Sequence, residues 1–351
     1  MPPPYHIGLP AAKKGEHHNS ISALWELKWK KRPKGWRARQ HWLKKKETQQ
    51  KPQSFIYEQH VSTELPNSQH HHVTPKGSHG RGRELHSIKA PIRLPSNASL
   101  GTKFPTILNI YGLDAHRLEH TMPSSHHIAN GWASVAIEIP GTGDCPADPN
   151  DPTSPDRLWT SVLDWMREQP WIDSERIVAW GVSCGGYYAM RIAHTHKDVL
   201  AGVVAQGGGC HHMFDPEWLE ITRFMEYPFD LAQVMASKFG YPDIEAMKVD
   251  SRKRFSLLEN GILDQPSTRL LCINGMLDEL FPIEDCILMT QHGSIKDARF
   301  YTDLKHMGEP VARKVSLEWV DKLFKSIPAS GSKALEKAEV KVTPLLNGYG
   351  H

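Results

Sequence analysis

The residues Gly-Val-Ser-Cys-Gly at positions 181–185 place a serine between two glycines. An apolar run before them predicts a strand, and a pattern of helical period follows them. The spacing G-x-S-x-G between a strand and a helix is typical of a nucleophile elbow, a sharp turn that exposes the serine hydroxyl. We therefore predict that Ser183 is a nucleophile that attacks a carbonyl carbon. The alternative is an ordinary strand-to-helix turn that contains Gly and Ser by chance.

A serine nucleophile needs a base that takes its proton and an acid that orients the base. On an elbow scaffold the acid and then the base follow the serine along the chain. Asp278 follows the apolar run 268–275, and His306 lies in the loop after the run 298–303. Parallel strands end at one edge of a sheet, so we expect both side chains at the edge that carries Ser183. The predicted catalytic residues are Ser183, Asp278 and His306.

Several neighbours of these residues leave alternatives open. Asp303 is a rival acid, although its closeness to His306 in the chain favours a local ion pair or cap. The thiol of Cys184 is a conceivable nucleophile, but the residue lies one position past the apex of the turn. We expect its backbone N–H to serve an oxyanion hole, together with the backbone N–H of Leu113 after an early strand.

His211 and His212 follow the apolar run 200–209, whose end faces the same edge as the elbow. Two interpretations carry equal weight. In the first, one of these histidines lines the pocket and bonds a substrate hydroxyl. In the second, a buried histidine connects the following segment to the sheet. We list His211 and His212 as candidate substrate-binding residues.

Strand and helix patterns alternate from about residue 85 onward. The runs 105–112 and 133–140 are continuously apolar and predict buried parallel strands, whereas 87–95 predicts an edge strand. Pro155 and Asp156 begin an amphipathic helix. This alternation predicts a mostly parallel, doubly wound sheet. Together with the elbow motif it indicates a sheet of the α/β-hydrolase type.

Residues 210–265 break the alternation, because they look helical and no strand pattern returns until 268. Insertions of this length before the late strands often carry binding sites. We expect a helical lid there. Its aromatic and methionine side chains suit a flat ring substrate or, as is commoner, pack into the core of the lid itself: Phe214, Trp218, Phe224, Met225, Tyr227 and Phe229.

Charge divides the chain of 351 residues unevenly. Residues 1–90 contain 17 Lys/Arg against 6 Asp/Glu and 10 of the 21 histidines, whereas the remainder contains 25 Lys/Arg against 33 Asp/Glu. Such a composition forms a core poorly. We predict a basic, His-rich region at 1–85 that is largely disordered or an incomplete cap, a catalytic domain at 86–330 and a tail at 331–351. Four tryptophans among the basic residues also allow nucleic-acid or membrane-surface contact, but we favour a poorly packed or truncated terminus: Trp25, Trp29, Trp36 and Trp42.

The first residues lack the apolar run of a secretory signal, and no apolar stretch of 18 residues occurs. The five cysteines show no zinc-type spacing, so we predict no metal site and a reducing compartment. We expect an intracellular protein, cytoplasmic or peripherally associated with endosomes or vesicles. A possible homodimer is part of the prediction, and a nucleic-acid partner or a transmembrane segment is not.

Three long strings carry a family resemblance: "AIEIPGTGDCPADPNDPTSPDRLW", "WGVSCGGYYAMRIAHTH" and "GGGCHHMFDPEWLE". They resemble fungal polyketide-chain-shortening hydrolases of melanin and conidial pigment biosynthesis, and the likeness continues through "YPFDLAQVMASKFGY", Asp278 and "KHMGEP". A more distant likeness is to FrsA-like esterases and to C–C hydrolases of the 2,6-dihydroxypseudooxynicotine type. The resemblance covers roughly residues 85–326. It departs at the N-terminus, where the helical cap region of the family is replaced by the basic segment.

The resemblance implies removal of a short acyl unit, such as acetoacetate, from an aromatic polyketide without a cofactor. A heptaketide naphthopyrone would yield 1,3,6,8-tetrahydroxynaphthalene. A general carboxylesterase with the same three residues is the nearest alternative. A non-catalytic paralogue that acts as a binding partner is the alternative from another class.

Overall fold

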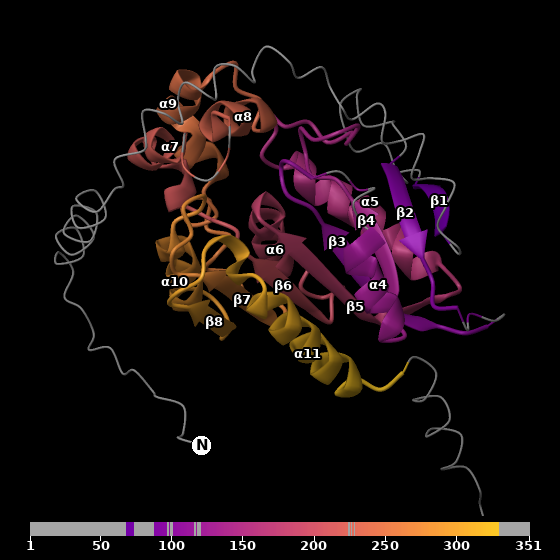
Figure 1. Cartoon of the computed structure of the whole chain (residues 1–351). Coiled ribbons are helices and arrows are strands. Elements are labelled where there is room, and N and C mark those ends of the chain that lie inside the picture. Colours follow the sequence, from indigo (N-terminus) through magenta and orange to yellow (C-terminus); the bar gives the residue numbers. More distant parts are fainter. Residues whose placement is uncertain are drawn as a thin grey trace, which may run out of the picture. The chain divides into compact units, whose positions relative to one another are not determined.

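The structure is a computed structural model that describes residues 68–73, 88–96, 98, 101–115, 117, 121–223, 225, 227 and 229–329. Its centre is an eight-stranded sheet with the order β1-β2-β4-β3-β5-β6-β7-β8 (Figure 1). The strands are β1 Ser68–Val73, β2 Ile88–Arg93, β3 Phe104–Ile110, β4 Ala133–Ile137, β5 Ile172–Val182, β6 Gly202–Gln206, β7 Leu270–Gly275 and β8 Asp297–Tyr301. The strands from β4 to β8 in this order pair in parallel. At the other end of the sheet, β2 pairs antiparallel with β4, and β1 pairs antiparallel with β2. The predicted mostly parallel sheet is confirmed.

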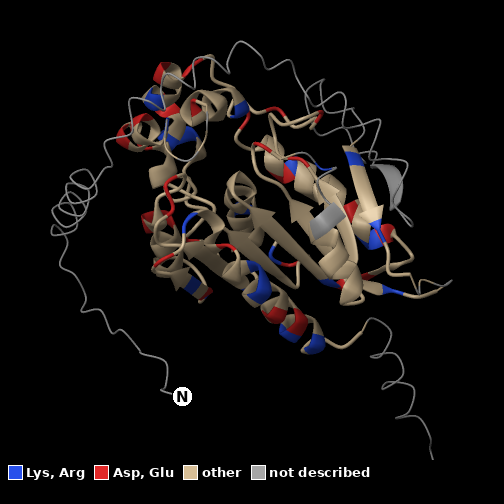
Figure 2. Ribbon diagram, viewed as in Figure 1, with Lys and Arg blue, Asp and Glu red and all other residues tan. Residues whose placement is uncertain are grey.

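Helices cover both faces of the sheet because neighbouring strand residues point to opposite sides. On β3, Leu108 packs into the core under α5, α6 and α10, whereas Ile107 packs into a second core with α11. In Figure 2 the ribbon segments coloured for Lys, Arg, Asp and Glu lie mainly on the helices and loops, and the middle of the sheet is nearly free of them. The helices are α4 Thr121–Ala129, α5 Ser154–Glu168, α6 Cys184–Thr195, α7 Pro216–Thr222, α8 Leu231–Lys238, α9 Ile244–Phe255, α10 Ile283–Gln291 and α11 Val311–Lys325.

The prediction that residues 87–95 form an edge strand is wrong. β2 lies between β4 and β1, and β1 pairs with it along the whole register from Ser68↔Arg93 to Val73↔Ile88. The three consecutive histidines at 70–72 therefore belong to the sheet. Their polar sequence carries no alternation of apolar residues, so only the pairing reveals the strand. The remaining residues of the predicted N-terminal region 1–85 and the tail 331–351 lie outside the described residues.

The insertion at 210–265 is helical, as expected, and consists of η2 His212–Phe214 followed by α7, α8 and α9. Figure 1 shows α7, α8 and α9 gathered in one cluster beyond the N-terminal end of α6. Phe214 is fully buried and packs edge-on against Tyr187 and Phe239, and Trp218 donates from its indole N–H to the carbonyl of Leu280. Both aromatic residues are therefore buried, and each contacts a residue outside the insertion. Phe224 lies outside the described residues.

Within the described part of the chain, no helix is both long and apolar enough to span a bilayer. The same residues place no group of three or more His, Cys, Asp or Glu side chains where they could hold a metal ion.

Candidate active site

The turn between β5 and α6 holds Ser183 in an unusual backbone conformation, with φ 55° and ψ −129°. Such a conformation costs a non-glycine residue about 1–3 kcal/mol. The two glycines of the motif are needed for close packing. A side chain on Gly181 would overlap the carbonyl oxygen of Gly185, and a side chain on Gly185 would overlap the carbonyl oxygen of Ile110. The local sequence thus forms the strained turn that the motif predicts.

The imidazole of His306 lies between Ser183 and Asp278. Its Nε2 is 2.9 Å from Ser183 Oγ, and its Nδ1 is 2.8 Å from Asp278 Oδ2. The first contact joins positions 123 residues apart in the chain, and the second joins positions 28 residues apart. Nδ1 donates to the carboxylate when it carries the hydrogen, which leaves Nε2 free to accept from the serine hydroxyl. The structure therefore brings together the three residues that the sequence predicts as a triad.

Asp278 is almost fully buried, with 1% of its surface exposed, and its carboxylate has several donors besides His306. Oδ2 accepts from Asn274 Nδ2 at 2.8 Å. Oδ1 accepts from the backbone N–H groups of Leu280 and Phe281, at 2.8 and 3.1 Å. These bonds compensate the carboxylate for lost hydration and hold it in one orientation toward the imidazole. The prediction from the sequence did not include Asn274, which lies in β7 four residues before the acid.

The segment after β3 borders the serine. A Cβ on Gly112 would stand 3.0 Å from Ser183 Cβ and 3.4 Å from its Oγ, so this glycine allows the segment to approach the hydroxyl closely. Leu113 follows and is buried. Cys184 is the first residue of α6, where backbone N–H groups of the first turn lack partners within the helix. The backbone N–H groups of Leu113 and Cys184 thus belong to segments next to the nucleophile, and their role in an oxyanion hole stays a prediction.

The alternatives for nucleophile and acid have less support. Burial raises the pKa of the Cys184 thiol to about 12, so the thiol stays protonated near neutral pH and is a weak nucleophile. Asp303 is exposed on the loop after β8, and the carboxylate that contacts His306 belongs to Asp278.

A buried carboxylate that the sequence did not reveal organises the segment after β6. Asp285, on α10, is fully buried, and its two oxygens accept from four consecutive backbone N–H groups. Oδ2 accepts from Cys210 at 2.9 Å and Met213 at 3.0 Å, and Oδ1 accepts from His211 at 3.1 Å and His212 at 2.7 Å. Burial raises the pKa of Asp285, and the N–H donors oppose this effect by stabilising the ionised form.

The side chains of the two histidines bond to the insertion. His211 is buried, and its Nδ1 is 2.7 Å from Ser256 Oγ at the end of α9. Burial lowers the pKa of His211 to about 4, so its ring is neutral near pH 7. His212 is partly exposed and pairs through Nδ1 with Asp215 at 2.8 Å. Both side-chain bonds lie within the segment 210–265, and the substrate contact and the structural connection to the sheet both stay predictions.

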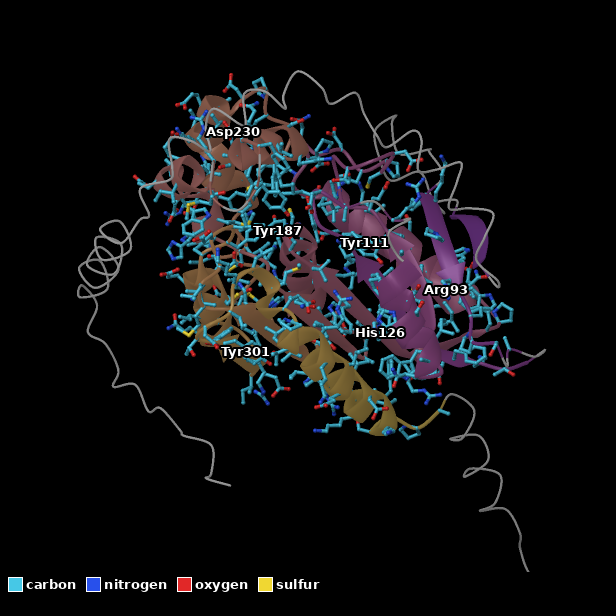
Figure 3. All side chains as sticks on the ribbon, in the orientation of Figure 1. Arg93, Tyr111, His126, Tyr187, Asp230 and Tyr301 are labelled. Carbon is cyan, nitrogen blue, oxygen red and sulfur yellow. The ribbon has the colours of Figure 1, made fainter. Side chains whose placement is uncertain are left out.

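A cavity of about 160 Å³ lies beside these elements. Its lining includes Tyr111, in the segment after β3, together with Val182 and Met307. Val182 directly precedes Ser183 in the sequence, and Met307 directly follows His306. His126 on α4 and Leu317 on α11 also line it; Figure 3 labels Tyr111 and His126. A cavity of about this volume accommodates a single benzene ring. The space can therefore hold one ring or a short acyl group.

A family model for FrsA-like esterases matches residues 87–323, which is more than half of the chain. The chain belongs to the FrsA-like esterase family. It is 29% identical to esterase FrsA of Salmonella typhi over 196 residues, which are 54% of this chain and 46% of the relative. It is 27% identical to esterase FrsA of Pectobacterium atrosepticum over 202 residues, which are 56% of this chain and 47% of the relative. The FrsA-like chain thus matches about half the length of these relatives.

Solved structures share the fold of this FrsA-like chain. The 2,6-dihydroxy-pseudo-oxynicotine hydrolase superposes with a TM-score of 0.62 at 17% identity, covering 77% of this chain and 71% of that one. AbyA5 superposes with a TM-score of 0.60 at 18% identity, covering 82% and 78%. Est1E from Butyrivibrio proteoclasticus gives 0.51 at 14% identity, covering 73% and 98%. The fold is that of the α/β-hydrolases.

Proposed function

We propose that the protein is a serine hydrolase that works through an acyl-enzyme on Ser183. The observation that carries the proposal is the position of His306, whose two ring nitrogens contact the serine hydroxyl and a buried carboxylate at 2.9 and 2.8 Å. A neutral hydroxyl attacks a carbonyl poorly unless a base accepts its proton, and this geometry supplies the base and its orienting acid. The same geometry argues against a non-catalytic paralogue, because a protein that only binds a partner does not require a serine, a histidine and a carboxylate in hydrogen-bond contact.

The proposed substrate is an aromatic polyketide that is shortened by cleavage of a C–C bond next to a ketone. The resemblance to fungal pigment hydrolases supports this assignment. The cavity of about 160 Å³, which is lined by the sequence neighbours Val182 and Met307 of Ser183 and His306, has room for a short acyl unit. In this assignment a naphthopyrone is converted to tetrahydroxynaphthalene and acetoacetate in pigment or melanin biosynthesis.

The reaction has two halves. Ser183 Oγ attacks the ketone carbon while His306 Nε2 takes the hydroxyl proton, and the N–H groups of Leu113 and Cys184 stabilise the oxyanion. The tetrahedral intermediate then breaks its C–C bond, the phenolic ring stabilises the departing carbanion as an enolate, and protonated His306 returns the proton to the leaving carbon. In the second half, His306 removes a proton from water, and the resulting hydroxide attacks the acyl-serine. Protonated His306 then returns this proton to Ser183 Oγ as the acyl–oxygen bond breaks and a carboxylic acid is released. Neither half uses a metal or an organic cofactor.

A carboxylesterase is the second candidate, and the match to the FrsA-like esterase family favours it. The first steps are identical, but the tetrahedral intermediate expels an alkoxide in place of a carbanion. An alkoxide needs no ring to stabilise it, so a simple ester would suffice as substrate. The two candidates therefore differ in whether a ketone attached to a phenolic ring is cleaved.

The deciding experiment incubates the purified full chain with a naphthopyrone and, separately, with p-nitrophenyl acetate. Mass spectrometry should detect tetrahydroxynaphthalene and acetoacetate in the first reaction. Ser183→Ala provides the control and should abolish product in both reactions. Turnover of the ester alone would replace the C–C assignment with the carboxylesterase, and turnover of both substrates by Ser183→Ala would contradict the serine mechanism.

A further inference from the structure

The loop that carries His306 has a strained shape of its own. Met307, the next residue, adopts φ 63° and ψ −2°, in the left-handed region. This conformation costs a residue with a side chain roughly 1–2 kcal/mol. One bond within the loop, from Gly308 N–H to the carbonyl of Lys305 at 2.9 Å, closes the turn. A turn of this kind persists when surrounding groups hold it, and the direction of the imidazole depends on it.

Gln206, the last residue of β6, contacts both the elbow and this loop. Its backbone carbonyl accepts from Ser183 N–H at 2.8 Å. Its side chain is 1% exposed, and its Nε2 donates to the carbonyl oxygen of Met307 and to Glu309 Oε1, both at 3.1 Å. Its Oε1 accepts from Trp180 Nε1 at 3.1 Å. A single residue thus joins the nucleophile turn to the histidine loop across 101 positions of the chain.

The chemistry of these partners requires an amide. The indole N–H of Trp180 can only donate, whereas the Met307 carbonyl and the ionised Glu309 carboxylate can only accept. A primary amide offers an acceptor on one side and two donors on the other. A glutamate of the same shape would have no donor when ionised, and a methionine could replace none of the three bonds that the amide makes.

The loop also packs directly on the end of β6. Gly207 has φ 74°, and a Cβ on it would stand 2.8 Å from Met307 Cγ and 2.9 Å from Met307 Cα. Glu309 Oε1 in turn accepts from Arg313 Nε at 3.2 Å and Nη2 at 3.1 Å, which anchors the far side of the loop to α11. The amide of Gln206 is therefore the bond that ties the strained Met307 peptide to the sheet.

We propose that Gln206 is a positioning residue of the reaction: it holds the Met307 carbonyl and thereby keeps the His306 imidazole between Ser183 and Asp278. The inference rests on the proposed serine mechanism. Without the amide, the loop can relax from its left-handed turn and the imidazole moves away from the serine. Displacements of about 1 Å at a reacting group lower rates by up to about 100-fold.

The test compares Gln206→Met and Gln206→Glu with wild type in the full chain. Tyr187→Phe is the control, because it disturbs buried side-chain bonding away from the histidine loop: Tyr187 Oη donates to the carbonyl of Phe255 at 2.8 Å in the core under α6. Three quantities are measured well below the melting temperature: kcat and KM for p-nitrophenyl acetate, the rate at which a fluorophosphonate labels Ser183, and the low-field proton resonance of the bond between His306 and Asp278.

Both Gln206 variants should lower kcat and the labelling rate by about 10- to 100-fold, with little change in KM, and should broaden the low-field resonance. Tyr187→Phe should lose thermal stability and retain the wild-type kcat, labelling rate and resonance. Wild-type labelling rates in folded Gln206→Glu, the variant of unchanged shape, would overturn the proposal. Failure of wild type itself to be labelled at Ser183 would instead count against the proposed serine mechanism, and the resonance would still report on Gln206.

Discussion

Replacing Asp285 with asparagine changes one buried group and leaves its shape intact. Each carboxylate oxygen accepts from two backbone N–H groups at the start of the insertion. The amide oxygen of asparagine can serve one of these pairs. Its NH₂ group must face the other pair, where donor meets donor. Two buried N–H groups then lack an acceptor, and each costs about 1–3 kcal/mol, so we expect Asp285→Asn to destabilise the protein by about 2–6 kcal/mol.

The melting temperature should report this loss directly. One kcal/mol lowers it by roughly 2–4 °C in a domain of about this size, so Asp285→Asn should melt on the order of 10 °C below wild type. Circular dichroism during heating at neutral pH measures the shift, and urea unfolding gives the free energy. Asp303→Asn is the control, because it makes the same chemical change at an exposed carboxylate. Surface substitutions of this kind usually change stability by no more than about 0.5 kcal/mol.

Equal melting temperatures for Asp285→Asn and wild type would refute the reasoning, since the two lost bonds would then contribute nothing. A large loss in Asp303→Asn as well would show that the effect comes from removing negative charge, and not from the buried bonds.

Three further predictions concern the site, the cavity and pH. Ser183→Ala should abolish turnover with a nearly unchanged melting temperature, and Asp278→Asn should lower kcat by about 10⁴-fold, because the imidazole would favour the wrong tautomer; an active Asp278→Asn with wild-type kcat would contradict the assigned acid. Leu317→Trp should fill the cavity of about 160 Å³ and shift the preference among p-nitrophenyl esters from hexanoate toward acetate. An unchanged preference would show that the cavity does not bind the acyl group. Burial lowers the pKa of His194 to about 4, so its neutral ring stabilises the fold fully above its ordinary value of 6.5, and this contribution is lost as pH falls from about 6.5 toward 4. The urea midpoint of His194→Gln should therefore fall less over that range than the wild-type midpoint, and parallel pH curves would argue against the shift.

The sequence predicts those features of the fold and the site whose signal is local or follows from the topology of the sheet. The glycines around Ser183 are a local requirement of the elbow, because a side chain at either position would overlap a backbone carbonyl. Asp278 and His306 were placed near the serine because each follows a late strand, and parallel strands end at one edge. The apolar runs of β3 and β4 were recognised because strands covered on both faces are apolar throughout.

Only the tertiary structure determines contacts between distant segments whose own sequences contain no pattern that predicts the contact. The sequence does not predict the histidine-containing strand β1, because its residues show no apolar alternation. Its place in the sheet depends on pairing with β2. Asp285 looks like any acidic residue in the first turn of a helix, yet it binds backbone N–H groups 72 to 75 residues away. Gln206 ends an apolar strand, and its amide meets the Met307 carbonyl only after the chain has folded. Backbone donors and acceptors are the same at every residue, so a side chain that bonds to a distant backbone group leaves no pattern in the sequence. Only the fold determines which backbone group it meets.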